Sequence, residues 1–343
     1  MAVVMGEEAL LWKRGKTVGK GSFGIVSLAS TSNVHDHHHV ALLNGVPPLP
    51  LQIAVKSCKF SNSRYVRAES EFLRMFQESP YVIRFFGVNV TQENGVILYN
   101  LLLEYASGGS LADCLDEDMN SRKGLKEYEV GKHTKNVLLG LSHVHSKGVI
   151  HCDIKPHNIL VVGTDRIAKI ADFGLAMTLE ESSEKEHGIR GTKRYMAPES
   201  VIYHQYGTEV DIWALGCTVY ELLTGKPLWK TSSDINDVKA DVLHKIAFEK
   251  PKIQNAKVSK EARDFLKRCL DKNPRSRWTA EMLLNHPFLN SSNVHPTKTR
   301  KKQSDMSLLR RIFKTQPHIR DLIKARIDAI MKKKLERKLV EGY

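Results

Sequence analysis

The sequence predicts an α+β fold in which a small strand-rich lobe precedes a large helical lobe. Residues 11–55 alternate short apolar runs with glycines, a pattern typical of strands joined by turns. After Ala106 the spacing of the apolar residues changes to that of helices. Apolar residues recur every three or four positions from Val130 to Val144, which marks one buried helix face, and residues 211–223 are apolar on nearly every side. With 343 residues, 41% of them hydrophobic, the chain can bury a sizeable core.

The net charge of +14 is concentrated at the C-terminal end of the chain. Residues 290–343 contain 15 Lys or Arg against 5 Asp or Glu, so this tail carries +10 and residues 1–289 carry +4. A fold that binds nucleic acid would spread basic residues over its own surface, so nucleic acid is not an expected partner. The tail also has apolar residues at helical spacing. It is interpreted as a helix packed on the helical lobe or a solvated arm, or alternatively as a docking helix for a partner, a nuclear-localisation patch or a membrane-surface helix.

No apolar run is long enough to span a bilayer. The longest, at residues 97–105, is short and interrupted by polar residues, and the N-terminus lacks a signal-peptide pattern. The five cysteines are widely spaced and include no C-x-x-C pair, so neither a disulfide framework nor a zinc site is indicated. We expect a protein of the cytoplasm, the nucleus or both, with reduced thiols and no transmembrane segment.

Residues 35–50, HDHHHVALLNGVPPLP, interrupt the strand pattern. They are interpreted as a loop inserted between two strands. The four histidines of this segment could bind a metal ion, and a solvated loop without a ligand is the alternative.

A glycine-rich segment, GKGSFGIV at residues 19–26, fits the pattern G-x-G-x-x-G-x-V between two apolar runs. Glycines let backbone N–H groups approach phosphate oxygens because no Cβ is in the way. A dinucleotide-binding fold would place a helix directly after these glycines, whereas the apolar run continues here as a strand. The segment therefore favours a phosphate-covering hairpin. Its candidate nucleotide-binding residues are Gly19, Lys20, Gly21, Ser22, Phe23, Gly24 and Val26.

A lysine ends the next apolar strand, IAVK at residues 53–56. Lys56 is the type of residue needed to pair with phosphates inside a cleft, and a surface lysine at a strand end is the alternative. Thirteen residues later a helical segment offers Glu69, which could hold the Lys56 ammonium on the α- and β-phosphates. Glu71 is the rival for this role. Glu69 is preferred because Phe72 and Leu73, three and four positions on, form the apolar face on the same side.

The most specific pattern is VIHCDIKPHNILV at residues 149–161, followed by KIADFGLA at residues 169–176. Asp153 can orient a hydroxyl group and accept its proton, and Lys155 can neutralise a transferred phosphoryl group. Asn158 and Asp172 can hold two Mg²⁺ ions. Polar residues at this fixed spacing are hard to explain as core packing.

This arrangement resembles the protein kinase family over about residues 11–289. The resemblance implies a two-lobe fold, with ATP and Mg²⁺ as cofactors bound between the lobes. It also implies the boundaries: an N-terminal lead at 1–10, a kinase domain at 11–289 with N-lobe 11–103, hinge 104–109 and C-lobe 110–289, and a basic tail at 290–343.

The resemblance assigns further positions around the nucleotide and in the helical lobe. Leu103 would be the gatekeeper, and the backbone of Glu104 and Ala106 would pair with the adenine edge. The residues that would sandwich the adenine ring are Ala54, Val26 and Leu160. In the helical lobe, Arg277 is expected to pair with Glu199, and Asp211 is expected to anchor the backbone of the catalytic loop.

Two positions indicate the subclass. Lys155 in DIKPHN and Thr192 in GTKRYMAPE are similar to those of serine/threonine kinases. GTKRYMAPES also resembles MEKK-type mitogen-activated protein kinase kinase kinases, and HCDIKPHNILV is most similar to a plant subgroup of them. This resemblance implies MAP kinase kinases as protein substrates. The alternatives are a serine/threonine kinase outside this cascade and a pseudokinase scaffold.

Cys152 stands where most regulated members of the family have arginine. An arginine there binds a phosphorylated activation loop, and a thiol cannot. We therefore expect phosphorylation of that loop to be a weak switch, unless Arg190 or Arg194 supplies the cation. The hydroxyl residues concerned are Ser182, Ser183 and Thr192.

Overall fold

The structure, a computed structural model, describes residues 12–31, 49–116, 123–183, 188–230 and 238–290. The chain divides into two units, Met1–Ser291 and Ser292–Tyr343, and the described residues all belong to the first. The expected N-terminal lead, the tail and most of the histidine-rich insert lie outside the described residues.

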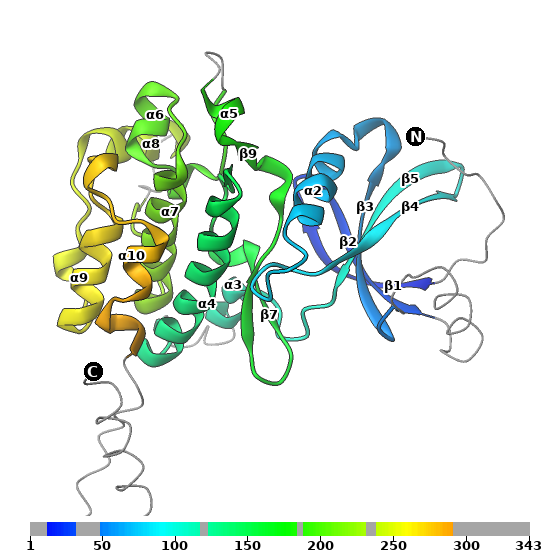
Figure 1. Cartoon of the computed structure of the whole chain (residues 1–343), viewed down its shortest axis with the longest axis horizontal. Coiled ribbons are helices and arrows are strands. Elements are labelled where there is room, and N and C mark those ends of the chain that lie inside the picture. The colour runs from blue at the N-terminus through cyan, green and yellow to red at the C-terminus, as the bar shows by residue number, and fades with distance from the viewer. Residues whose placement is uncertain (1–11, 32–48, 117–122, 184–187, 231–237, 291–343) are drawn as a thin grey trace, which may run out of the picture. The chain divides into compact units, whose positions relative to one another are not determined.

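In its described residues the small lobe is a five-stranded antiparallel sheet in the order β1-β2-β3-β5-β4, with the α-helix α2 (Figure 1). The bounds of its elements are β1 Trp12–Gly21, β2 Gly24–Thr31, β3 Gln52–Lys59, α2 Arg64–Met75, β4 Phe85–Glu93 and β5 Val96–Glu104. The pleat of β3 separates its side chains into two sets, because alternate residues face opposite sides of a sheet. Ile53 and Val55 belong to a small outer cluster, whereas Ala54 belongs to the main core shared with the helices.

The large lobe is mainly helical, which confirms the predicted α+β class (Figure 1). Its bounds are α3 Leu111–Asp116, α4 Glu127–Ser146, α5 Leu179–Ser182, α6 Pro198–Tyr203, α7 Thr208–Thr224, α8 Val238–Phe248, α9 Lys260–Cys269 and α10 Ala280–Leu284. The periodic face predicted between Val130 and Val144 is buried on α4. Helix α7 is buried over most of its length, as its apolar composition predicts. None of the described helices is long and apolar enough to cross a membrane.

Short strands at the junction of the lobes carry the loops of the candidate site. Strand β6 (Val149–Ile150) pairs with β9 (Met177–Thr178), and β7 (Ile159–Val162) pairs with β8 (Ile167–Ile170). The N–H of Ile83 donates to the carbonyl of Ile170 (2.9 Å), and the Lys169 ammonium lies 2.8 Å from the Glu104 carboxylate. The first bond joins the segment before β4 to β8, and the ion pair joins the end of β5 to β8. All five cysteines, each in a described segment, are free thiols.

Candidate active site

A buried carboxylate of α7 binds the backbone of the loop between β6 and β7. Asp211 is fully buried and accepts hydrogen bonds from the backbone N–H groups of His151 (2.8 Å) and Cys152 (2.9 Å). Its third contact, with His145 Nε2, measures 2.9 Å. Cys152 has a positive φ of 65°, an uncommon conformation for a side-chain-bearing residue. The bonds to Asp211 stabilise this turn, which directs the next residue, Asp153, toward the junction of the lobes.

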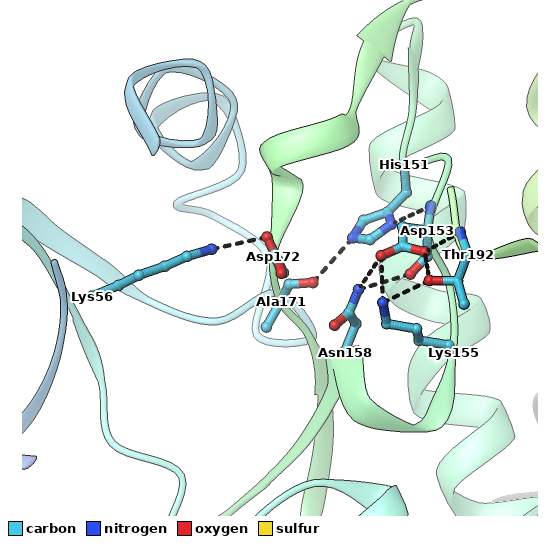
Figure 2. A network of polar contacts seen from close by, with 8 residues as sticks. All are labelled: Lys56, His151, Asp153, Lys155, Asn158, Ala171, Asp172 and Thr192. Carbon is cyan, nitrogen blue, oxygen red and sulfur yellow. Dashed lines mark hydrogen bonds and ion pairs between the residues drawn. The ribbon is translucent and has the colours of Figure 1, made fainter. Parts of the chain in front are cut away.

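Asp153 accepts hydrogen bonds through both carboxylate oxygens (Figure 2). Its Oδ1 accepts from the hydroxyl (2.7 Å) and the backbone N–H (2.9 Å) of Thr192. Its Oδ2 accepts from the Lys155 ammonium (2.7 Å) and the Asn158 amide (3.0 Å). Lys155 also donates to the Thr192 hydroxyl (2.8 Å). Four donor groups from three residues therefore fix the orientation of one carboxylate, as a positioned base requires.

Lys56 lies on β3 and forms two ion pairs. Its ammonium is 2.6 Å from Glu69 of α2 and 2.9 Å from Asp172, and both Lys56 and Glu69 are buried. Burial alone would lower the pKa of Lys56, but the nearby carboxylates of Glu69 and Asp172 outweigh it and raise that pKa above its usual value. Burial alone would raise the pKa of Asp172. The nearby Lys56 ammonium outweighs this effect of burial, so the pKa of Asp172 is lowered. Lys56 is charged at neutral pH.

The structure distinguishes the two glutamates that the sequence gives as candidate partners of Lys56. Glu69 is 1% exposed and faces the sheet, whereas Glu71 is exposed to solvent. Glu69→Gln is therefore expected to lower kcat/KM for phosphoryl transfer by at least about tenfold, because it removes the charge that positions a buried ammonium. Glu71→Gln is the matched control, expected to stay within about twofold of the wild type because an exposed charge contributes little. Steady-state kinetics of both variants check this, and equal losses would contradict the assignment.

The glycine-rich segment forms the hairpin of β1 and β2. Gly19 pairs with Val26 and Gly21 with Gly24, so Ser22 and Phe23 make the turn. A Cβ at Gly24 would lie 2.6 Å from the carbonyl oxygen of Ser57, too close for any other residue. The Phe23 ring packs on Tyr65 of α2, with centroids 4.5 Å apart. The hairpin is thus the predicted one, and no helix follows it directly.

The candidate metal ligands lie on neighbouring stretches of backbone. The carbonyl of Asn158 accepts from the N–H of Ala171 (2.9 Å), the neighbour of Asp172, and Figure 2 shows the Asn158 side chain bonded to Asp153 and the Asp172 side chain paired with Lys56. A carboxylate and an amide are oxygen donors, the kind that Mg²⁺ prefers, and this ion usually keeps waters and binds phosphate oxygens in addition. The two residues therefore fit Mg²⁺ as part of a shared site with a phosphate group. The described residues contain no cluster of three or more His, Cys, Asp or Glu suited to a metal.

The predicted adenine residues converge on the end of β5. Ala54 pairs with Leu103 across β3 and β5, and Leu160 forms a bridge with Ser110 just after the connection between lobes. Val161 exchanges backbone hydrogen bonds with this connection, at Gly108 (3.0 Å) and Gly109 (2.8 Å). Strand β5 extends to Glu104, one residue into the expected hinge. The N–H of Glu104 already donates to the carbonyl of Arg84 (2.8 Å), so an adenine edge can meet Glu104 only through its carbonyl.

Sequence reasoning missed the structural role of Arg190. Its backbone N–H donates to the hydroxyl of Tyr206 (2.8 Å), and its guanidinium donates to the carbonyls of Leu175 (3.5 Å) and Ala176 (3.4 Å). Arg190 therefore joins the beginning and the end of the segment that carries Ser182 and Ser183. No local sequence pattern predicts these contacts, because each partner is at least 14 residues away from Arg190.

The next residue, Gly191, lies against the catalytic loop. It has a φ of 97°, and a Cβ there would lie 2.4 Å from the carbonyl oxygen of Cys152. Burial, together with nearby Asp211, raises the pKa of the Cys152 thiol well above its usual value. The thiol is therefore neutral at physiological pH, and the cation close to it is Arg190.

Comparison with known proteins gives one family and a set of relatives. Residues 12–289 match the protein kinase domain. Mitogen-activated protein kinase kinase kinase 20 of Arabidopsis thaliana is 43% identical over 282 residues, which cover 81% of this chain and 78% of that protein. Kinase kinase kinases 18 and 17 of the same plant are 40% and 38% identical, each over 81% of this chain and over 77% and 69% of their own lengths.

Proposed function

This chain belongs to the protein kinase family, and from that membership we propose that it phosphorylates MAP kinase kinases as a mitogen-activated protein kinase kinase kinase. It is a serine/threonine protein kinase that uses ATP. The observation that carries the proposal is the identity of about 40% with three curated kinases of that name over four-fifths of the chain. The contacts of Lys155 and Thr192 with Asp153, the positions from which the subclass was predicted, support it.

The geometry suggests how each residue contributes to phosphoryl transfer. Asp153 would orient the acceptor hydroxyl and take its proton, and Lys155 would neutralise the phosphoryl group as it moves. Lys56, held by Glu69, would bind the α- and β-phosphates. Mg²⁺, for which Asn158 and Asp172 are the proposed ligands, would neutralise charge on the phosphates when bound. The glycine-rich hairpin would cover the phosphates with backbone N–H groups.

The proposal is tested with purified kinase and a panel of MAP kinase kinases made inactive by mutation. Phosphorylation of serine or threonine in their activation loops, absent from an Asp153→Ala preparation, is the expected result. Phosphorylation of a generic acceptor protein but of no MAP kinase kinase would indicate a kinase outside the cascade. A lack of ATP turnover on every acceptor would indicate a scaffold.

The structure adds to the expectation that loop phosphorylation is a weak switch. Ser182 and Ser183 lie at the end of α5, where their hydroxyls donate to the carbonyls of Leu179 and Glu180 (2.7 Å each). Arg190 already joins the two ends of this segment without a phosphate. The double substitution Ser182→Ala and Ser183→Ala is therefore expected to leave kcat/KM within a few fold of the wild type, well under the tenfold change that about 1.4 kcal/mol represents.

Phosphatase treatment provides the independent measurement for that prediction. The treated wild-type enzyme is expected to keep its activity within the same limit. A hundredfold loss that rephosphorylation of the serines restores would show that a cation binds a phosphate in this segment.

A further inference from the structure

The tip of the glycine-rich hairpin contacts helix α2 through two aromatic rings. Phe23, in the turn between β1 and β2, packs on Tyr65 in the first turn of α2, with ring centroids 4.5 Å apart and ring planes inclined by 31°. Aromatic rings at this separation attract each other more than their apolar area alone would predict. Phe23 is half-buried against the main core, whereas Tyr65 is 43% exposed. We refer to Phe23 and Tyr65 as the hairpin–α2 pair.

The ring of Phe23 lies beside the groups that are expected to bind phosphates. A Cβ at Gly174 would lie 3.2 Å from this ring, so a glycine at that position lets the ring approach closely. The Lys56 ammonium lies 6.0 Å from the centroid of the same ring. That ammonium pairs with Asp172, as Figure 2 shows. Phe23 therefore borders the place where the proposed phosphate and Mg²⁺ ligands meet.

Tyr65 lies on the same face of α2 as Glu69. The two residues are four positions apart, a spacing that makes side chains neighbours on a helix surface. Glu69 holds the Lys56 ammonium at 2.6 Å, and α2 also packs against the 3₁₀ turn η3 (Phe173–Leu175). The hairpin–α2 pair therefore connects the hairpin tip to the helix that positions Lys56.

Phe23 is the inward-packing side chain of the hairpin tip. Ser22 before it is exposed, and Ile25 is 44% exposed. Strand β1 is exposed along most of its length, and its pairing with β2 contains two register shifts. Segments with few buried contacts open locally at a low cost in free energy. The position of the tip over the site therefore depends on the contact of Phe23 with Tyr65.

We propose that Tyr65 is a positioning residue that, through Phe23, holds the phosphate-covering hairpin closed over ATP. The inference rests on the role proposed for the hairpin as the phosphate cover. A closed hairpin excludes water from the γ-phosphoryl group, so this group passes to the acceptor hydroxyl and less often to water, the reaction that gives ADP and inorganic phosphate. Closure also slows the release of ADP. The transfer step itself stays with Asp153 and Lys155.

The test measures two quantities for one purified variant, Tyr65→Ala. Tyr65 is 43% exposed, so we expect the variant to fold like the wild type. The ratio of ATP hydrolysis without acceptor to phosphorylation of a generic acceptor protein is expected to rise about fivefold, an effect of the size that one aromatic pair supports. The dissociation rate of a fluorescent ADP analogue, measured by stopped flow, is also expected to rise about fivefold.

Two variants control for changes that do not involve the hairpin. Tyr65→Phe keeps the ring, so both quantities are expected to stay within about twofold of the wild type. Tyr128→Ala removes a tyrosine of similar exposure, 38%, on α4, and is expected to stay within the same limit. The acceptor in these assays is a generic protein, so the comparison does not depend on MAP kinase kinases being the substrates.

Phe23→Ala completes a double-variant cycle. In the Phe23→Ala background, Tyr65→Ala is expected to change both quantities by less than about twofold, because the partner ring is gone. A full fivefold effect of Tyr65→Ala in that background would show that the two residues act independently, which overturns the inference. An unchanged hydrolysis ratio and ADP dissociation rate in Tyr65→Ala alone would show that the pair does not hold the hairpin. Equal losses of hydrolysis and transfer, with unchanged ADP release, would assign Tyr65 to the structure of α2 alone.

Discussion

Asp153→Ala is expected to lower kcat about 10²- to 10⁴-fold while nucleotide affinity stays nearly unchanged. The variant removes the carboxylate that four hydrogen-bond donors orient toward the acceptor, and Asp153 makes no predicted phosphate contact. Single-turnover phosphorylation separates the chemical step from binding, and fluorescence titration with a nucleotide analogue measures affinity.

Asp165→Ala is the control for that experiment, because Asp165 is exposed on the turn between β7 and β8. Its kcat is expected to stay within about twofold of the wild type. Near-normal turnover by Asp153→Ala would show that another group takes the proton. A parallel loss of nucleotide binding would show that the variant disturbs Asn158, which also donates to the Asp153 backbone carbonyl (2.9 Å).

Arg277→Met is expected to destabilise the kinase domain by about 3–5 kcal/mol. The Arg277 side chain is fully buried and forms two parallel bonds with Glu199, of 2.6 Å and 3.1 Å. It also donates to the carbonyls of Glu209 (2.7 Å) and Asp271 (2.9 Å). Methionine fills much of the volume but leaves the Glu199 carboxylate buried without its cation.

Equilibrium unfolding in urea, followed by tryptophan fluorescence, measures that loss. Arg275→Met is the control because Arg275 lies two residues away and is exposed, so its effect is expected within about 0.5 kcal/mol. The double variant Arg277→Met and Glu199→Gln is expected to recover part of the stability, because the unpaired charge is gone. Equal midpoints for the two arginine variants would contradict the role of this ion pair.

The parts of the site that were predictable are those in which chemistry dictates residue type and spacing. Asp153, Lys155 and Asn158 lie within six residues of one another, so the sequence carries their relation directly. Glu69 was chosen over Glu71 from the apolar face of one helix, and the buried position of Glu69 agrees with that choice. Such inferences need only one helix or one loop.

The parts that were not predictable depend on contacts distant in sequence. Arg190 contacts Leu175 and Ala176 because the chain folds back across the catalytic loop. No local periodicity of the sequence predicts such a fold-back. One local signal was present in the sequence. The carboxylate of Glu181 accepts from the N–H of Thr178 (2.7 Å) in a capping box of α5. The spacing Thr-x-x-Glu at residues 178–181 is the usual sequence sign of that motif.

The bonds from Asp211 to the catalytic loop have a consequence for local unfolding. The amide protons of His151 and Cys152 are held by a carboxylate on a helix that forms the centre of the large lobe. They can exchange with solvent only when that helix separates from the loop, which amounts to opening the whole lobe. The glycine-rich hairpin has no such anchor, since β1 is exposed along most of its length. We therefore expect slow amide exchange in the loop that carries the base and faster exchange in the hairpin that would cover the phosphates.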